Sequence, residues 1–247
     1  MVDISVIAWI NGLSALAVVV MCIYIGVSFA VKYKKERKRL QPYVSVLGFI
    51  WASSYSAVIW DLLSLMTTGV NVTPVQLAYL AYWNVPLVIV LVMFLGFDLF
   101  APESRNKVMI IYAVTAIPYY ILFFGFTQSF FTATVTPGEL VNIAMTGILA
   151  LMLLLYVVSA LIIVAGGFFQ LQRRLTGPEK RNTIYLFLGW TFYPLGALME
   201  TTFPVAFTPI ARVVMILAFY FLIRGFTGTV PKAPESIIST QNPVQTE

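Results

Sequence analysis

The most constraining feature of this chain is a succession of long apolar runs separated only by short polar segments. A helix that crosses a hydrocarbon core of about 30 Å at 1.5 Å per residue needs about 20 apolar residues. We place such helices at residues 5–31, 42–67, 75–100, 108–130, 139–170, 183–205 and 208–228. The sequence therefore predicts an all-α, polytopic membrane protein, with a bundle of seven transmembrane helices over residues 1–228.

The composition agrees with lipid as the main solvent of the chain. Of its 247 residues, 60% are hydrophobic and 10% are charged, whereas soluble domains carry roughly a quarter charged residues. We therefore expect a multi-pass protein of the cell membrane, in contact with the lipid bilayer. The short connections leave no room for a soluble catalytic domain. Residues 229–247, rich in Pro, Ser, Thr and Gln, are predicted to form a disordered cytoplasmic tail.

Two residue types that carry much of enzyme and metal chemistry are nearly absent. The chain has no histidine and one cysteine, Cys22, which lies inside the first apolar run. The usual zinc, copper and haem ligand sets depend on these residues, and so do Ser-His and Cys-His nucleophile pairs. We expect a non-enzymatic protein with no catalytic residue, no metal site and no cofactor.

The basic residues gather at one end of the predicted helices. The first connection holds six Lys and Arg within residues 32–39, and the rest of this set is Arg105, Lys107, Arg173, Arg174, Lys180, Arg181, Arg224 and Lys232. The opposite connections, at 68–74, 131–138 and 204–208, contain none. Because Lys and Arg in short loops stay on the cytoplasmic side, we predict an N-terminus outside and a C-terminus in the cytoplasm. Topology explains the net charge of +5, and we expect no nucleic-acid partner.

Three charged residues fall at helix depth, where insertion of a charge costs about 2.5–3.5 kcal/mol. They are Asp61, Glu200 and Arg212, each near the outer end of its predicted helix. With helices 6 and 7 antiparallel and helix 2 beside helix 7, we predict one buried charge cluster. It is either an ion pair that locks the three helices or a site that exchanges a proton or cation, because two carboxylates face one guanidinium. Glu139 is predicted to open the fifth helix, where a carboxylate complements the helix dipole.

Aromatic and small residues mark the faces of two predicted helices. Trp190 and Tyr193 share a stripe with Glu200 on the sixth helix, and Gly189 and Gly196 beside it allow close approach of another helix. Such stripes are either core packing or the walls of an outward-facing pocket for a small or apolar ligand. The candidate pocket residues are Tyr79, Tyr82, Trp83, Asn84, Trp190 and Tyr193.

Part of the sixth helix resembles that of microbial rhodopsins, as do the helix order and the N-outside orientation. The residues that carry this resemblance are Arg181 and Asn182, followed by Trp190, Thr191, Phe192, Tyr193 and Pro194. The resemblance implies rhodopsin-like helix packing. That family binds retinal through a lysine in the middle of the seventh helix, whereas residues 208–228 contain no lysine. The third-helix acid and arginine pattern of the family is missing too, so neither a retinal Schiff base nor light-driven pumping is implied.

Roughly the last 50 residues of the bundle also resemble the seven-helix membrane regions of some prokaryotic histidine kinases and their free-standing archaeal relatives. The segments concerned are 178–181, 189–200, 209–212 and 224–226. This resemblance implies a sensor whose output passes to a separate signalling partner in the cytoplasm or the membrane.

Three functions stay open at the level of the sequence. The leading hypothesis is a non-enzymatic sensor or receptor-like protein that binds no retinal. The alternatives are a proton or ion transporter or channel that uses Asp61 and Glu200, and an accessory subunit of a larger membrane complex. A homo-oligomer is compatible with each of them.

Overall fold

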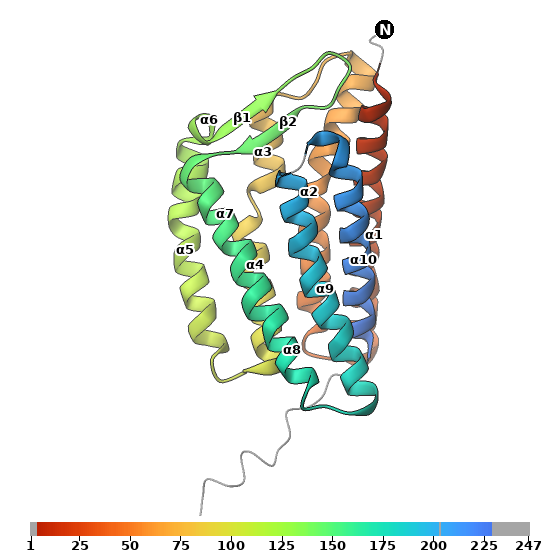
Figure 1. The fold of residues 1–247 in the computed structure, drawn as a ribbon, viewed down its shortest axis with the longest axis vertical. Helices are drawn as coiled ribbons and strands as arrows, with labels where there is room; N and C mark the ends of the chain where they lie inside the picture. Colours follow the sequence, from red (N-terminus) through yellow and green to blue (C-terminus); the bar gives the residue numbers. More distant parts are fainter. Residues whose placement is uncertain (1–3, 203, 229–247) are drawn as a thin grey trace, which may run out of the picture.

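The chain folds into a bundle of long helices with a short β-hairpin across one end (Figure 1). The structure is a computed structural model that describes residues 4–202 and 204–228. Its helices are α1 (Val6–Glu36), α2 (Gln41–Thr68), α3 (Pro74–Tyr82), α4 (Val85–Phe100), α5 (Arg105–Gly125), α6 (Thr127–Phe130), α7 (Gly147–Ser159), α8 (Gly166–Gln172), α9 (Gly177–Thr202) and α10 (Thr208–Thr227). The predicted tail at 229–247 lies outside the described residues.

Four short elements complete the described part of the chain. A π-helical stretch, Ala160–Ala165, joins α7 to α8, and a 3-10 turn, Val205–Phe207, leads into α10. Strands β1 (Phe131–Thr134) and β2 (Asn142–Met145) pair antiparallel, with Phe131 opposite Met145. We call the end of the bundle with this hairpin and the start of α1 the hairpin end, and the opposite end, where the Lys- and Arg-rich connections lie, the basic end.

The structure supports a membrane protein with several spans. Six segments are long and apolar enough to cross a bilayer: Val6–Glu36, Gln41–Thr68, Pro74–Phe100, Arg105–Gly125, Gly147–Gln172 and Val205–Thr227. Helix α9 also runs between the two ends, beside α10 (Figure 1). It is not among the six because polar residues interrupt its apolar stretch. A seventh crossing therefore stays a prediction, as does the orientation.

The third predicted helix, 75–100, is in fact broken between α3 and α4. Pro86 lacks the N–H that an unbroken helix would use, and Asn84 lies at the break. The Asn84 side chain is fully buried. Its Nδ2 donates to the Ile50 carbonyl at 3.0 Å and to Ser53 Oγ at 2.8 Å, while its Oδ1 accepts from Ser54 Oγ at 2.9 Å. Helix α2 thus supplies the partners that hold the break.

The start of the fifth predicted helix, 139–170, is wrong, because this helix begins only at Gly147. The preceding residues, from Phe131 onward, form the hairpin, whose first strand contains the β-branched residues that favour strands. Pro137 and Gly138 make its turn: the Glu139 N–H donates to the Thr136 carbonyl at 3.0 Å, and Gly138 has a φ of 77°. A turn with Pro second and a left-handed Gly third is type II. Glu139 therefore closes a turn and does not open a helix.

Glycines bring two pairs of helices into close contact. A Cβ on Gly48 of α2 would lie 2.7 Å from the Gly26 nitrogen and 2.9 Å from the Cys22 carbonyl oxygen of α1. A Cβ on Gly196 of α9 would lie 3.1 Å from the Ala211 carbonyl oxygen of α10. The predicted close approach along the glycine face of α9 is confirmed.

Candidate functional site

A buried ion pair joins three helices near the hairpin end. The Arg212 guanidinium, 4% exposed, lies 2.9 Å from Glu200 Oε1 through Nη2 and donates to the same oxygen through Nε at 3.0 Å. Its Nη1 donates to the Asn11 carbonyl and, at 3.0 Å, to Ser14 Oγ. One arginine of α10 is therefore bonded to both α9 and α1.

A fourth helix reaches the pair through Tyr55 of α2. The Tyr55 hydroxyl lies 3.3 Å from Glu200 Oε2 and 2.7 Å from Met215 Sδ. The Glu200 side chain remains 23% exposed. The result is a polar network that ties α1, α2, α9 and α10 together, within an otherwise apolar interior.

Asp61, the third member of the predicted cluster, is bonded elsewhere. Its carboxylate, on a residue that is 1% exposed, accepts from the backbone N–H of Val72 at 2.9 Å and of Val141 at 2.7 Å. Both of its oxygens also accept from Asn71 Nδ2 at 3.2 Å. Asp61 thus fastens the α2–α3 loop and the hairpin loop to the end of α2.

The placement of α1 explains why the predicted trio does not assemble. Helix α1 packs against both α2 and α10, so Arg212 finds its remaining partners on α1. Two carboxylates do not face one guanidinium: Glu200 is balanced by Arg212, and Asp61 by N–H donors. The grouping of two carboxylates on one guanidinium, which suggested proton exchange, is therefore absent from the described residues.

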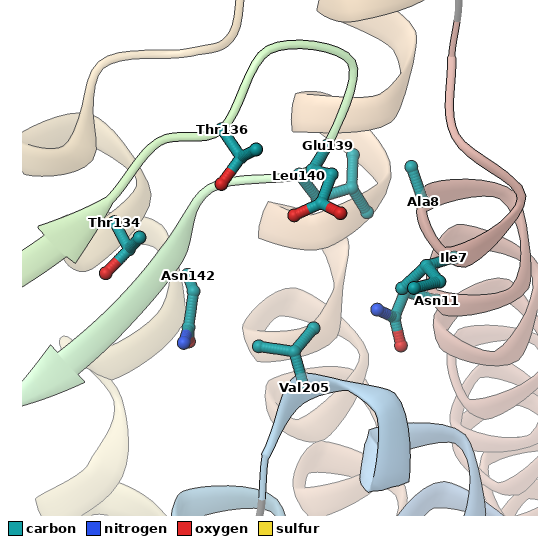
Figure 2. Close-up of a pocket in the computed structure, with 9 residues that line it drawn as sticks. All are labelled: Ile7, Ala8, Asn11, Thr134, Thr136, Glu139, Leu140, Asn142 and Val205. Atoms are coloured by element: carbon teal, nitrogen blue, oxygen red, sulfur yellow. The ribbon is translucent and has the colours of Figure 1, made fainter.

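A cavity of about 100 Å³ lies beside the ion pair, between the hairpin loop, α1 and the turn before α10 (Figure 2). Its polar lining comes from Asn11, Thr134, Thr136, Glu139 and Asn142, and its apolar lining from Ile7, Ala8, Leu140 and Val205. A water molecule needs roughly 10–15 Å³ by this measure, so the cavity can hold several waters or one small solute. Asn11 belongs to both features, since its carbonyl binds Arg212 and its side chain lines the cavity.

Comparison with known proteins adds no identity to this site. No family model, no curated protein and no solved structure matches the chain. The function proposed for the site therefore rests on its own geometry.

The six residues of the predicted aromatic pocket lie in separate surroundings. Trp190 and Tyr193 pack on Trp51, with ring centroids at 6.2 and 4.8 Å. Trp83 is 38% exposed at the surface of the bundle, and Asn84 holds the α3–α4 break as described.

The remaining two pack against the α5 and hairpin side. Tyr79 lies edge-on to Phe123 at 5.5 Å, and Tyr82 lies 5.4 Å from Phe131. None of the six predicted residues lines the hairpin-end cavity. In this fold they serve packing and the helix break, which was the competing interpretation of the stripes.

Sequence reasoning missed the residues that make the cavity. Asn11 is one amide in a long apolar run, and Thr134, Thr136 and Asn142 belong to a segment that was assigned to a loop and a helix. The available signal was the Thr-Pro-Gly turn between two β-prone stretches, which is typical of a hairpin. A hairpin at these residues places Glu139 directly after the turn, where it lines the cavity, and not at the start of a helix.

Proposed function

We propose that this protein is a non-enzymatic seven-helix membrane sensor, with its hairpin end outside and its basic end in the cytoplasm. It binds a small ligand in the hairpin-end cavity and passes the change along its helices to a separate partner. The observation that carries the proposal is the double role of Asn11, which lines the cavity and binds the Arg212 that links α1, α9 and α10.

The mechanism follows from how the linked helices are arranged. A ligand that shifts Asn11 changes one bond of Arg212, and with it the balance between its contacts to α1 and to Glu200 on α9. Helices α1 and α10 carry that shift to the basic end, where their last turns hold Lys34, Lys35 and Arg224. A ligand moves such an equilibrium only by its difference in affinity for the two states.

Transport is less well supported by the same interior. Among the described residues, the buried polar side chains toward the basic end are Gln41, Ser45, Asn182 and Thr183. None of these ionises near neutral pH, so no chain of titratable groups continues inward from Glu200. Proton flux through protein-containing liposomes that is lost in Glu200→Gln would nevertheless favour a transporter over a sensor.

The sensor proposal is tested by a distance at the basic end. Spin labels on Lys35→Cys of α1 and Arg181→Cys of α9, in a Cys22→Ala background, report the separation of the two helices. We expect the double variant Glu200→Gln, Arg212→Met to shift this distance distribution. The control is Thr201→Val, whose hydroxyl bonds only to carbonyls of its own helix. If the double variant has the wild-type distance distribution, the ion pair does not affect the separation of the helices at the basic end. The sensor proposal would then be wrong.

A further inference from the structure

We propose that the hairpin-end cavity binds a primary ammonium group carried on a short apolar chain. This inference deepens the proposed function, since it names the ligand class of the same cavity. The charge balance of the hairpin end, one buried acceptor and the lining of the cavity support it.

One described carboxylate of the hairpin end, that of Glu139, has no bonded partner. The charged residues described at the hairpin end are Asp61, Glu139, Glu200 and Arg212. Asp61 accepts from three N–H groups of its own loops, and Glu200 is paired with Arg212. Within residues 4–202 and 204–228, the Glu139 carboxylate has neither an ion pair nor a hydrogen bond. The cavity therefore presents a free negative charge.

Asn11 adds a second, independent sign of a missing donor. Its residue is 5% exposed, and its side-chain Oδ1 has no hydrogen-bond partner in the described part of the chain. A buried acceptor left unpaired costs about 1–3 kcal/mol. Figure 2 shows the Asn11 and Glu139 side chains on opposite sides of the same space. Asn11 Oδ1 is enclosed, and Figure 2 shows the amide nitrogen of Asn11 turned toward the space. A group with several N–H donors placed there would bind Glu139 directly and would reach Asn11 Oδ1 after a rotation of the amide.

The carboxylate is held in place by its backbone. The Ser5 N–H of the α1 cap donates to the Gly138 carbonyl at 2.9 Å, and Asn71 Nδ2 donates to the Glu139 carbonyl at 2.9 Å. Two residues further, Val141 N–H is fixed on Asp61 at 2.7 Å. The loop is thus fastened on both sides of Glu139, so its backbone needs little ordering on binding.

The lining selects among cations. An ammonium group has three donors and no acceptor, which matches carboxylate, amide and hydroxyl oxygens. The apolar wall of Ile7, Ala8, Leu140 and Val205 then suits a short hydrocarbon chain. A coordinated metal lacks its usual ligands, because no group of three or more His, Cys, Asp or Glu occurs among the described residues. An anion would meet Glu139, while Arg212, the one cation among the residues described at this end, is already paired.

The experiment uses the full chain in nanodiscs and n-propylammonium chloride as the probe. Calorimetry and thermal unfolding are expected to show saturable binding, and 1-propanol or sodium propionate at equal concentration should not reproduce it. We expect Glu139→Gln to weaken the affinity at least about tenfold, because a charge-assisted bond is lost. The matched control is Glu103→Gln, an exposed carboxylate at the basic end, which should bind as wild type does.

The source of the ammonium group is resolved by lipid composition. Phosphatidylcholine discs lack a primary amine, whereas phosphatidylethanolamine discs carry one on the headgroup. Weaker apparent binding of propylammonium in the second discs supports the lipid headgroup as ligand, and unchanged binding supports a free amine. Equal binding by Glu139→Gln, or equal effects of propanol, would overturn the inference.

The two experiments separate the ammonium-binding inference from the sensor proposal. Propylammonium that binds without moving the labels at positions 35 and 181 leaves this inference standing and counts against the sensor. A cavity that binds no amine overturns this inference, while the distance measured in the double variant still tests the sensor.

Discussion

Individual charged residues in this protein are compensated in two different ways. The Glu200 carboxylate is neutralised by a guanidinium, whereas the Asp61 carboxylate is surrounded by N–H donors of two loops. The first arrangement fixes helices to each other, and the second fixes loops to a helix. Substitutions at the two positions should therefore fail in different ways.

Removal of Arg212 alone should be more damaging than removal of the whole pair. Arg212→Met leaves Glu200 charged in a desolvated site, which typically costs about 3–5 kcal/mol when the orphan is fully buried. Because 23% of the Glu200 side chain is exposed, we expect a loss of about 3 kcal/mol. Adding Glu200→Gln should recover about half of it. Thermal unfolding in detergent measures both, and a double variant less stable than the single one would contradict the argument.

Asp61→Asn should release the loops while leaving the helices assembled. An amide at this position offers one acceptor oxygen and turns its NH₂ toward backbone N–H groups that need an acceptor. Each buried N–H left unpaired costs about 1–3 kcal/mol. Because Val72 and Val141 bond to different oxygens of Asp61, we expect at least one of these two amides to lose protection in hydrogen exchange. Ser45→Ala is the control, because that hydroxyl bonds to Gly26 far from the loops. Unchanged protection at both amides would show that Asp61 does not hold them.

The sequence made the depth of these charges and the pairing of Glu200 with Arg212 predictable, but not the partners of Asp61. Depth follows from counting residues along a helix, and Asp61, Glu200 and Arg212 do all lie toward the hairpin end. The partners depend on helix rotation and on which helix lies between which, and here α1 stands between α2 and α10. Asn11 could not be singled out, because its role depends on Arg212, about 200 residues further along the chain.

At the scale of the element, small residues decide how closely helices approach. Gly48 and Gly196 lie against the backbone of a neighbouring helix, so their missing side chains set the distance between axes. This feature was predictable for α9, where two glycines recur along one face. The β-hairpin was not predicted, because its strands are only four residues long and the second one runs on into the apolar helix α7.

Gly48→Ala should destabilise the α1–α2 pair. The added Cβ would lie 2.7 Å from the Gly26 nitrogen and 2.9 Å from the Cys22 oxygen, and neither backbone atom can move aside cheaply. Overpacking of this kind typically costs about 1–3 kcal/mol. Gly166→Ala is the matched control: its φ is −60°, nothing lies within 4 Å of its Cβ position, and alanine favours the helix by up to about 1 kcal/mol. The opposite order of unfolding temperatures would mean that α1 and α2 are not in backbone contact.

At the scale of the whole molecule, the two ends of the bundle carry charges of opposite sign. Basic residues occupy the connections at one end, and the other holds the hairpin, the cavity and a surplus of carboxylates. Since Lys and Arg in short loops are retained in the cytoplasm, an impermeant maleimide should label Thr134→Cys in intact cells. Lys35→Cys should react only after permeabilisation. Cys22 is fully buried, and replacing it with alanine removes any background.

The same reagent decides whether α9 is the seventh crossing. Helix α9 runs between the two ends beside α10, yet it is less apolar than the six other candidates and carries Glu200. Its cost of insertion is reduced because Arg212 pairs with that carboxylate and glycines let α10 cover it. We therefore expect Arg181→Cys to behave like Lys35→Cys, and Ala206→Cys to behave like Thr134→Cys. Labelling of positions 181 and 206 from the same side would show that α9 does not cross, and six spans would then place both ends of the described chain on one side.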